Sequence, residues 1–103
     1  MDINEKYLRQ SKRTASRIYG NTAVVLLLNK GNNRKANRLF ALDPAPTFVW
    51  RLIERPLKIK LLTAKIIKEK KFFLGKKKAM LLIRGLLKSE IVEIIDNPEE
   101  AFR

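Results

Sequence analysis

Two short apolar segments and a helix start follow one another closely, and this order limits the fold more than any other feature of the chain. The segments are Ala23–Leu28 and Asn37–Leu42, and the residues between them are rich in Gly and Asn, which tolerate positive φ angles and let the chain reverse. The second segment ends at Asp43-Pro44, where Asp43 can cap free N–H groups and Pro44 has the φ angle of a first helical residue. The sequence therefore predicts a β-hairpin that leads directly into a helix.

A further strand and two further helices are predicted around this unit. Alternating side chains over Arg13–Tyr19 indicate a strand, which a Gly20-Asn21 turn would join to Thr22–Leu28. The run Ala23–Leu28 lacks alternation, so we expect it to be the central strand. If order in space follows order in sequence, Arg38–Leu42 is then an edge strand with unpaired backbone groups. The predicted helices cover Pro46–Glu54, Leu57–Lys71 and Lys76–Ser89, with Gly75 as the stop of the second.

The two ends of the chain carry weaker signals. Residues 1–12 are polar and show no obvious core position, so we expect them to be flexible. The segment Ile91–Ile95 either continues the last helix or forms a short terminal strand before Asn97-Pro98. The predicted fold class is α+β and winged-helix-like, with a three-stranded antiparallel sheet followed by three helices, in a single domain over residues 1–103.

The composition argues against catalysis and against a membrane span. The chain has no Cys and no His, which removes thiolate chemistry, the usual metal ligands and the usual base near neutral pH. Glu54, Glu69, Glu90 and Glu93 lie on separate segments or polar faces, and no phosphate-binding glycine motif occurs. No segment approaches the ~20 apolar residues of a membrane span. We expect a cytoplasmic binding protein that is not an enzyme, uses no cofactor and has no membrane partner.

The charge is strongly positive and uneven. The formal net charge is +13, and residues 55–88 contain twelve Lys or Arg and one acidic residue. Such a field attracts anionic partners without selecting among them, and a lysine-rich surface also serves solubility. Lys76–Lys78 would stand at the positive end of a helix dipole, which is mildly unfavourable for cations and so indicates either a use for them or a cost tolerated in solvent. Trp50 is expected to be a core or core-rim residue, with a recognition role as the lesser alternative.

The order of these elements resembles the PqqD-like family. The resemblance rests on the strand Val24–Leu28, the strand Arg38–Asp43 ending Leu-Phe-Ala-Leu-Asp, and the helix Phe48–Ile53 with its aromatic and Trp-Arg-Leu-Ile pattern. It extends loosely to Leu86–Val92, so that about residues 13–95 are covered. The chain departs from the family pattern in having Glu54-Arg55-Pro56 where Asp-Gly is common, and in its many lysines.

The resemblance implies a function in peptide recognition. Members of this family are similar to the recognition element of ribosomally made, modified peptides, which holds the leader segment of a precursor peptide and presents it to a radical S-adenosylmethionine enzyme. The leader would add as a strand beside the third strand and lie against the third helix. Basic residues near that groove would favour an acidic leader. The implied peptide-binding residues are Arg38, Leu39, Phe40, Ala41, Leu42, Lys76, Lys77, Lys78, Met80 and Arg84.

Three alternatives stay open at this stage. A winged-helix nucleic-acid-binding protein fits the charge equally well, although the exposed residues expected on the third helix could contact only phosphate, because they include no Asn or Gln to recognise adenine. A structural subunit would need a large apolar surface, for which Phe72-Phe73-Leu74 is the candidate. The exposed edge strand could also pair with a second copy of the chain to form a homodimer.

Overall fold

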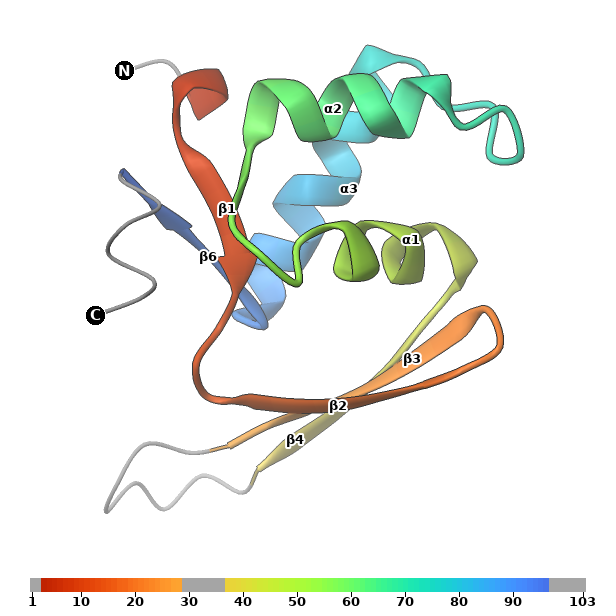
Figure 1. Ribbon diagram of the computed structural model, residues 1–103. Helices are drawn as coiled ribbons and strands as arrows, with labels where there is room; N and C mark the ends of the chain where they lie inside the picture. The colour runs from red at the N-terminus through yellow and green to blue at the C-terminus, as the bar shows by residue number, and fades with distance from the viewer. Residues whose placement is uncertain (1–2, 29–36, 97–103) are drawn as a thin grey trace.

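The chain folds into two antiparallel sheets and three helices. The computed structural model describes residues 3–28 and 37–96, and within them the sheets have the strand orders β2-β3-β4 and β5-β1-β6 (Figure 1). The fold is therefore α+β, and the predicted three-stranded antiparallel sheet followed by three helices is confirmed. The predicted hairpin loop falls at residues 29–36 and lies outside the described residues.

The first sheet is built as the sequence indicates. It consists of β2 (Thr14–Tyr19), β3 (Thr22–Leu27) and β4 (Arg38–Leu42), with β3 in the centre and β4 as an edge. Gly20 supplies the positive φ angle of 62° that the two-residue turn between β2 and β3 requires. Alternate residues of β3 are buried on one face, which packs on the helices, and only half-buried on the other. Both predictions for this sheet, the central β3 and the edge position of β4, are confirmed.

The second sheet corrects the expectation of a flexible N-terminus. A short 3₁₀ helix, η1 (Ile3–Glu5), leads into β1 (Tyr7–Gln10), which pairs on one side with β5 (Leu57–Lys58) and on the other with β6 (Val92–Ile95). Leu8 has no exposed surface, so β1 contributes to the core through this residue. The sequence left helix and strand as alternatives for Ile91–Ile95, and the structure shows a strand there, β6. Two ion pairs join the same segments: Arg9 of β1 pairs with Glu93 of β6, and Lys6, just before β1, pairs with Asp96, just after β6.

The three helices are α1 (Pro44–Leu52), α2 (Ile59–Lys68) and α3 (Lys76–Ser89). Of these, α1 lies on the inner face of the first sheet, and α2 lies beyond α1, next to α3 and to the start of β1 (Figure 1). The predicted bounds of α3 are confirmed, whereas α2 ends three residues before Lys71. Gly75 is the N-cap of α3 rather than the stop of α2. Asp43 precedes α1 as predicted, but its side chain makes no capping hydrogen bond and its carbonyl accepts from Thr47 N–H at 2.9 Å instead.

Trp50 fastens α1 into the core. It is only 1% exposed, as expected for a core residue, and its Nε1–H donates to Ser16 Oγ of β2 at 3.1 Å. Its carbonyl accepts a hydrogen bond from Gln10 Nε2 of β1 at 2.9 Å. One residue of α1 therefore contacts both sheets, which fixes the position of the helix between them. In the part of the chain that the structure describes, no helix has the length and apolar character needed to cross a bilayer.

Candidate functional site: the β4–α3 groove

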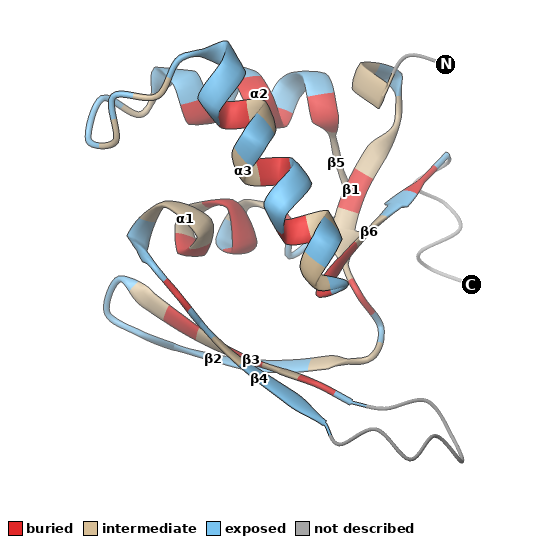
Figure 2. Ribbon diagram, turned by 180° about the vertical axis from the view of Figure 1, so that it is seen from behind, coloured by how far each residue is buried: buried red, intermediate tan, exposed pale blue. Residues whose placement is uncertain are grey.

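An apolar groove lies between the edge strand β4 and the helix α3. Its volume is about 290 Å³. Figure 2 views the molecule from this side, with α3 above β4 and most of β4 exposed. The lining residues are Phe40 and Leu42 of β4, Pro46 of α1, and Leu81, Leu82, Gly85, Leu86 and Ser89 of α3.

The hydrogen-bond pattern of the sheet shows which groups of β4 face outward. Just after β3, Leu28 N–H donates to the carbonyl of Arg13 at 2.8 Å. Because hydrogen bonding alternates along an antiparallel strand, the backbone groups of the even-numbered residues of β3 bond to β2. The odd-numbered residues of β3 then face β4 and pair with its even-numbered residues. By alternation, the N–H and C=O groups of Leu39 and Ala41 point to the free edge. An extended peptide can pair with these two residues without disturbing the sheet.

The groove contains a glycine at a position where a helix ordinarily carries a side chain. Gly85 lies in the interior of α3, where glycine costs about 1 kcal/mol relative to alanine. A Cβ atom built on it would meet no atom within 4 Å. No close packing inside the protein therefore requires glycine here. Its effect is to leave space over the helix between Leu81 and Leu86.

One end of the groove is closed by an ion pair. Arg38 Nη2, at the start of β4, donates to Glu90 Oε2 at 3.0 Å, and Glu90 follows the last residue of α3. The Arg38 guanidinium also lies 5.8 Å from the centre of the Phe40 ring. Arg38, predicted as a peptide contact, is thus already engaged by the protein. Glu90 Oε2 also lies 3.8 Å from Arg13 Nη2, so two guanidinium groups share one carboxylate and this end of the groove keeps a net positive charge.

The basic residues predicted for this site are only partly brought to it. Lys76–Lys78 form the first turn of α3 and are exposed. Lys78 lies one helical turn before Leu82 on the side of α3 that faces the groove, as the 3.6-residue period requires. None of the four predicted basic residues of α3 lines the groove itself, neither Lys76, Lys77 and Lys78 nor Arg84. Positive charge therefore lies near both ends of the groove, at Lys78 and at Arg38.

Met80 lies on another side of α3. Its Sδ atom is 3.6 Å from Thr63 Oγ1 of α2, so the side chain packs between the two helices and away from β4. Sequence reasoning placed Met80 at the peptide site and missed Leu81 and Leu86 as groove residues. Leu81 is 56% exposed and falls off the buried stripe of α3. That mismatch, together with the helical Gly85, is the signal that could have located the groove.

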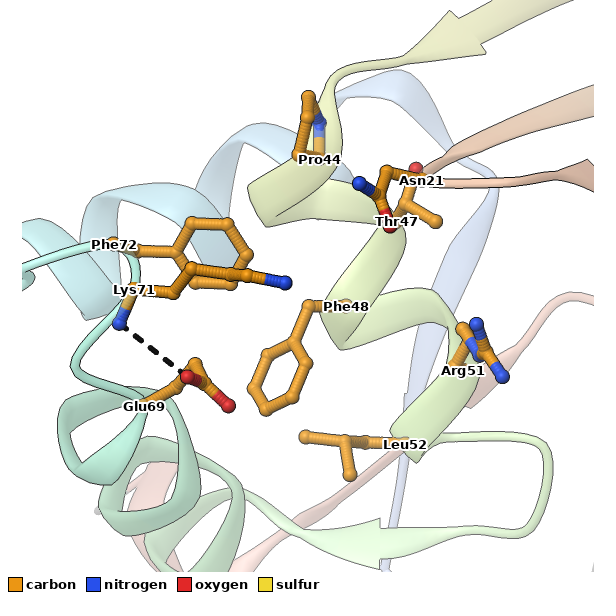
Figure 3. Close-up of a pocket in the computed structure, with 9 residues that line it drawn as sticks. All are labelled: Asn21, Pro44, Thr47, Phe48, Arg51, Leu52, Glu69, Lys71 and Phe72. Carbon is orange, nitrogen blue, oxygen red and sulfur yellow. Dashed lines mark hydrogen bonds between the residues drawn. The ribbon is translucent and has the colours of Figure 1, made fainter.

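A second hollow lies on the opposite side of α1. It has a volume of about 380 Å³, and Figure 3 shows its lining residues, from the β2–β3 turn, from α1 and from the segment after α2. The rings of Phe48 and Phe72 form its apolar wall, with centres 5.6 Å apart and planes inclined at 53°. Glu69 Oε1 accepts the backbone N–H of Lys71 at 3.3 Å across its mouth.

No metal-binding cluster occurs among the described residues, where no three His, Cys, Asp or Glu side chains come together. Comparisons with protein-family models, with curated proteins and with solved structures find no match to this chain. The candidate site therefore has to be judged on its own geometry.

Proposed function

We propose that this protein is a non-catalytic peptide-binding protein that holds an extended segment of a precursor peptide in the β4–α3 groove. The observation that carries the proposal is the position of the groove beside a free strand edge. Leu39 and Ala41 offer unpaired backbone groups, while Leu42, Leu82 and Leu86 offer an apolar wall to alternate side chains of an added strand.

Backbone pairing supplies affinity with little dependence on peptide sequence. Leu39 and Ala41 together present two N–H and two C=O groups, each able to form a bond worth about 1 kcal/mol net. Burial of apolar side chains in the groove adds selectivity for a peptide with hydrophobic residues at every second position. Lys78 at one end favours an acidic segment there.

The proposal extends to the partner and the location by resemblance to the PqqD-like family. The bound segment would be the leader of a precursor peptide, and the partner a modifying enzyme of the radical S-adenosylmethionine type, which carries the cofactor and the chemistry. We also propose that this protein acts in the cytoplasm, because no segment of the sequence approaches the length of a membrane span. Presentation by a separate small protein suits this site. A peptide that pairs with β4 through one of its edges keeps its second edge free for the partner enzyme.

The test measures the binding of a fluorescent acidic peptide, taken from a reading frame beside this gene, to three variants. Ala41→Pro removes an outward N–H on β4, and Ile18→Pro makes the equivalent change on β2, the opposite edge, because edge strands tolerate proline at outward positions. Gly85→Phe places a ring in the groove, and the protein has no atom within 4 Å of the new Cβ that would clash with it. We expect Ala41→Pro and Gly85→Phe to weaken binding at least about tenfold and Ile18→Pro to leave it unchanged.

Two results would overturn the proposal. One is full peptide affinity in Ala41→Pro and Gly85→Phe, with both variants folded by circular dichroism. The other is an absence of peptide binding accompanied by salt-sensitive binding of duplex DNA that falls when Lys76–Lys78 are changed to Glu. The second result would favour a nucleic-acid-binding protein.

A further inference from the structure

The outward face of α2 is both apolar and basic, which is unusual for the solvent side of a helix. The inward side of α2 already contributes Ile59, Leu62 and Ile66 to the core. On the outward side, Leu61 is 52% exposed and Ile67 is 41% exposed. A shallow hollow of about 430 Å³ lies over this side. We call this surface the α2 face, and it comprises Lys60, Leu61, Ala64, Lys65, Ile67 and Lys68.

The α2 face continues into neighbouring apolar surface. Lys65 and Lys68 also line the next hollow, together with Phe48 and Leu52 of α1. Phe48 and Leu52 in turn belong to the pocket in Figure 3. A belt of aliphatic and aromatic groups, bordered by lysine side chains, therefore extends from α2 to α1. The flexible stems of the lysines can lie along such a belt while their charges stay in water.

Phe73 adds a large aromatic side chain just beyond α2. It is 87% exposed and has a positive φ angle of 50°. A left-handed backbone is unfavourable for phenylalanine, and so much exposed ring surface gains nothing from the protein interior. The folded chain accepts both costs at one residue. A partner that covers the ring would offset both costs.

The charges around this surface are nearly all positive and free. Residues 58–78 contain nine lysines and a single acidic residue, Glu69. Lys58 pairs with Glu5 at 3.0 Å. The other eight form no ion pair with a described residue. An anionic partner would therefore be attracted to this surface without first breaking internal contacts.

We propose that the α2 face, with Phe73, docks on the surface of an anionic lipid bilayer. Lysines near such a surface each contribute about 1 kcal/mol, and exposed Leu, Ile and Phe side chains insert among the headgroups. Nucleic acid fits less well, because Leu61, Ala64 and Ile67 can bond neither phosphate nor base edges. The sequence led to the expectation of no membrane partner, because no segment could span a bilayer. Docking on a bilayer surface needs no spanning helix, so this proposal revises that expectation.

This inference is independent of peptide binding, because the α2 face and the β4–α3 groove share no residue. A peptide held in the groove would be brought to a membrane surface if both proposals hold. Failure of one leaves the other standing, and separate variants test them. Phe73→Asn and Leu61→Ser change the α2 face alone.

The experiment is co-sedimentation of the full chain with vesicles of phosphatidylcholine and with vesicles that also contain phosphatidylglycerol. We expect binding only to the anionic vesicles, weakened by salt. Phe73→Asn and Leu61→Ser should each lower the partition coefficient roughly tenfold. The matched control is Leu39→Ser, which removes a leucine that is more exposed than Leu61, at 69% against 52%, from the outer face of the first sheet and should leave partitioning unchanged.

A second measurement follows insertion directly. Phe73→Trp adds a second fluorophore at the exposed position. After subtraction of the signal of the buried Trp50, measured on the wild type, the emission of the new tryptophan should shift to the blue on adding anionic vesicles and be quenched by brominated lipid. The proposal is overturned if no anionic vesicle binds, if Leu39→Ser weakens binding as much as Leu61→Ser, or if the tryptophan stays in water. It is also overturned if the chain binds duplex DNA more tightly than anionic vesicles and Phe73→Asn changes neither the DNA affinity nor the vesicle affinity, because charge alone would then account for binding.

Discussion

A single hydroxyl group links the three elements that define the edge of the groove. Thr47 of α1 is only 2% exposed. Its Oγ1 accepts the N–H of Ala23, at the start of β3, at 2.9 Å, and donates to the carbonyl of Leu42, at the end of β4, at 3.1 Å. Thr47→Val keeps the shape of the side chain and removes both hydrogen bonds. It therefore isolates the contribution of this bridge.

The expected loss follows from the two groups left behind. A buried donor or acceptor without a partner costs about 1–3 kcal/mol. The Ala23 N–H bears this cost in full and the Leu42 carbonyl only in part, because its second lone pair stays available, so the free energy of unfolding should fall by about 2–4 kcal/mol. That is a large part of the roughly 5–15 kcal/mol that stabilises a domain of this size. Leu42 lines the groove, so peptide affinity should fall as well.

Thr63→Val is the matched control. Thr63 is 6% exposed, but its Oγ1 donates within its own helix, to the carbonyl of Ile59 at 2.9 Å. Removing a hydroxyl that bonds back to the preceding turn strands no buried donor, so the loss should stay below about 1 kcal/mol. Urea unfolding followed by Trp50 fluorescence measures both variants. Losses equal within about 0.5 kcal/mol would refute the reasoning, because the bridge would then carry no special weight.

Three further predictions concern other parts of the chain. Leu8→Ala should lower the free energy of unfolding by about 2–5 kcal/mol in urea titrations, whereas a flexible N-terminus would make it neutral. Phe73→Asn should leave stability unchanged or raise it by up to about 1 kcal/mol in thermal unfolding, because asparagine tolerates a positive φ angle; a clear loss would contradict the exposed position. The side-chain hydrogen bond from Lys58 to Glu5, and then the charge of Glu5, raise the pKa of Lys58 above 10.5. A pKa that is higher in the folded than in the unfolded state stabilises the fold at pH values below the unfolded-state pKa, and this stabilisation is lost as the pH rises through the folded-state pKa. Over that alkaline range, the free energy of unfolding in urea titrations should therefore fall less in Lys58→Met than in the wild type. An identical fall in both would contradict the pairing.

The sheet around β3 was predictable because its signals are local. The two-residue Gly20-Asn21 turn, the continuous apolar run from Ala23 and the Asp43-Pro44 helix start each act within a few residues. The second sheet was not predictable for the opposite reason. Its central strand offers one core residue, Leu8, and its register depends on partners about 50 and 85 residues away.

The candidate site was half predictable. The edge position of β4 follows from strand order, and Phe40 and Leu42 do line the groove. The side of α3 that meets them was misjudged, because leucines at positions 81, 82, 86 and 87 make two adjacent stripes look equally apolar. Only packing on α2 decides between them, and it turns Met80 inward and leaves Leu81 exposed.

The most direct test of peptide binding in the groove is an NMR titration of the isotopically labelled chain with the acidic peptide. The groove predicts shifts confined to residues 38–42 and 81–89, slowed exchange of the Leu39 and Ala41 amides, and intermolecular contacts between the peptide backbone and β4. Shifts that follow the edge of β2, or that are confined to the lysines of residues 58–78, would contradict strand addition at β4.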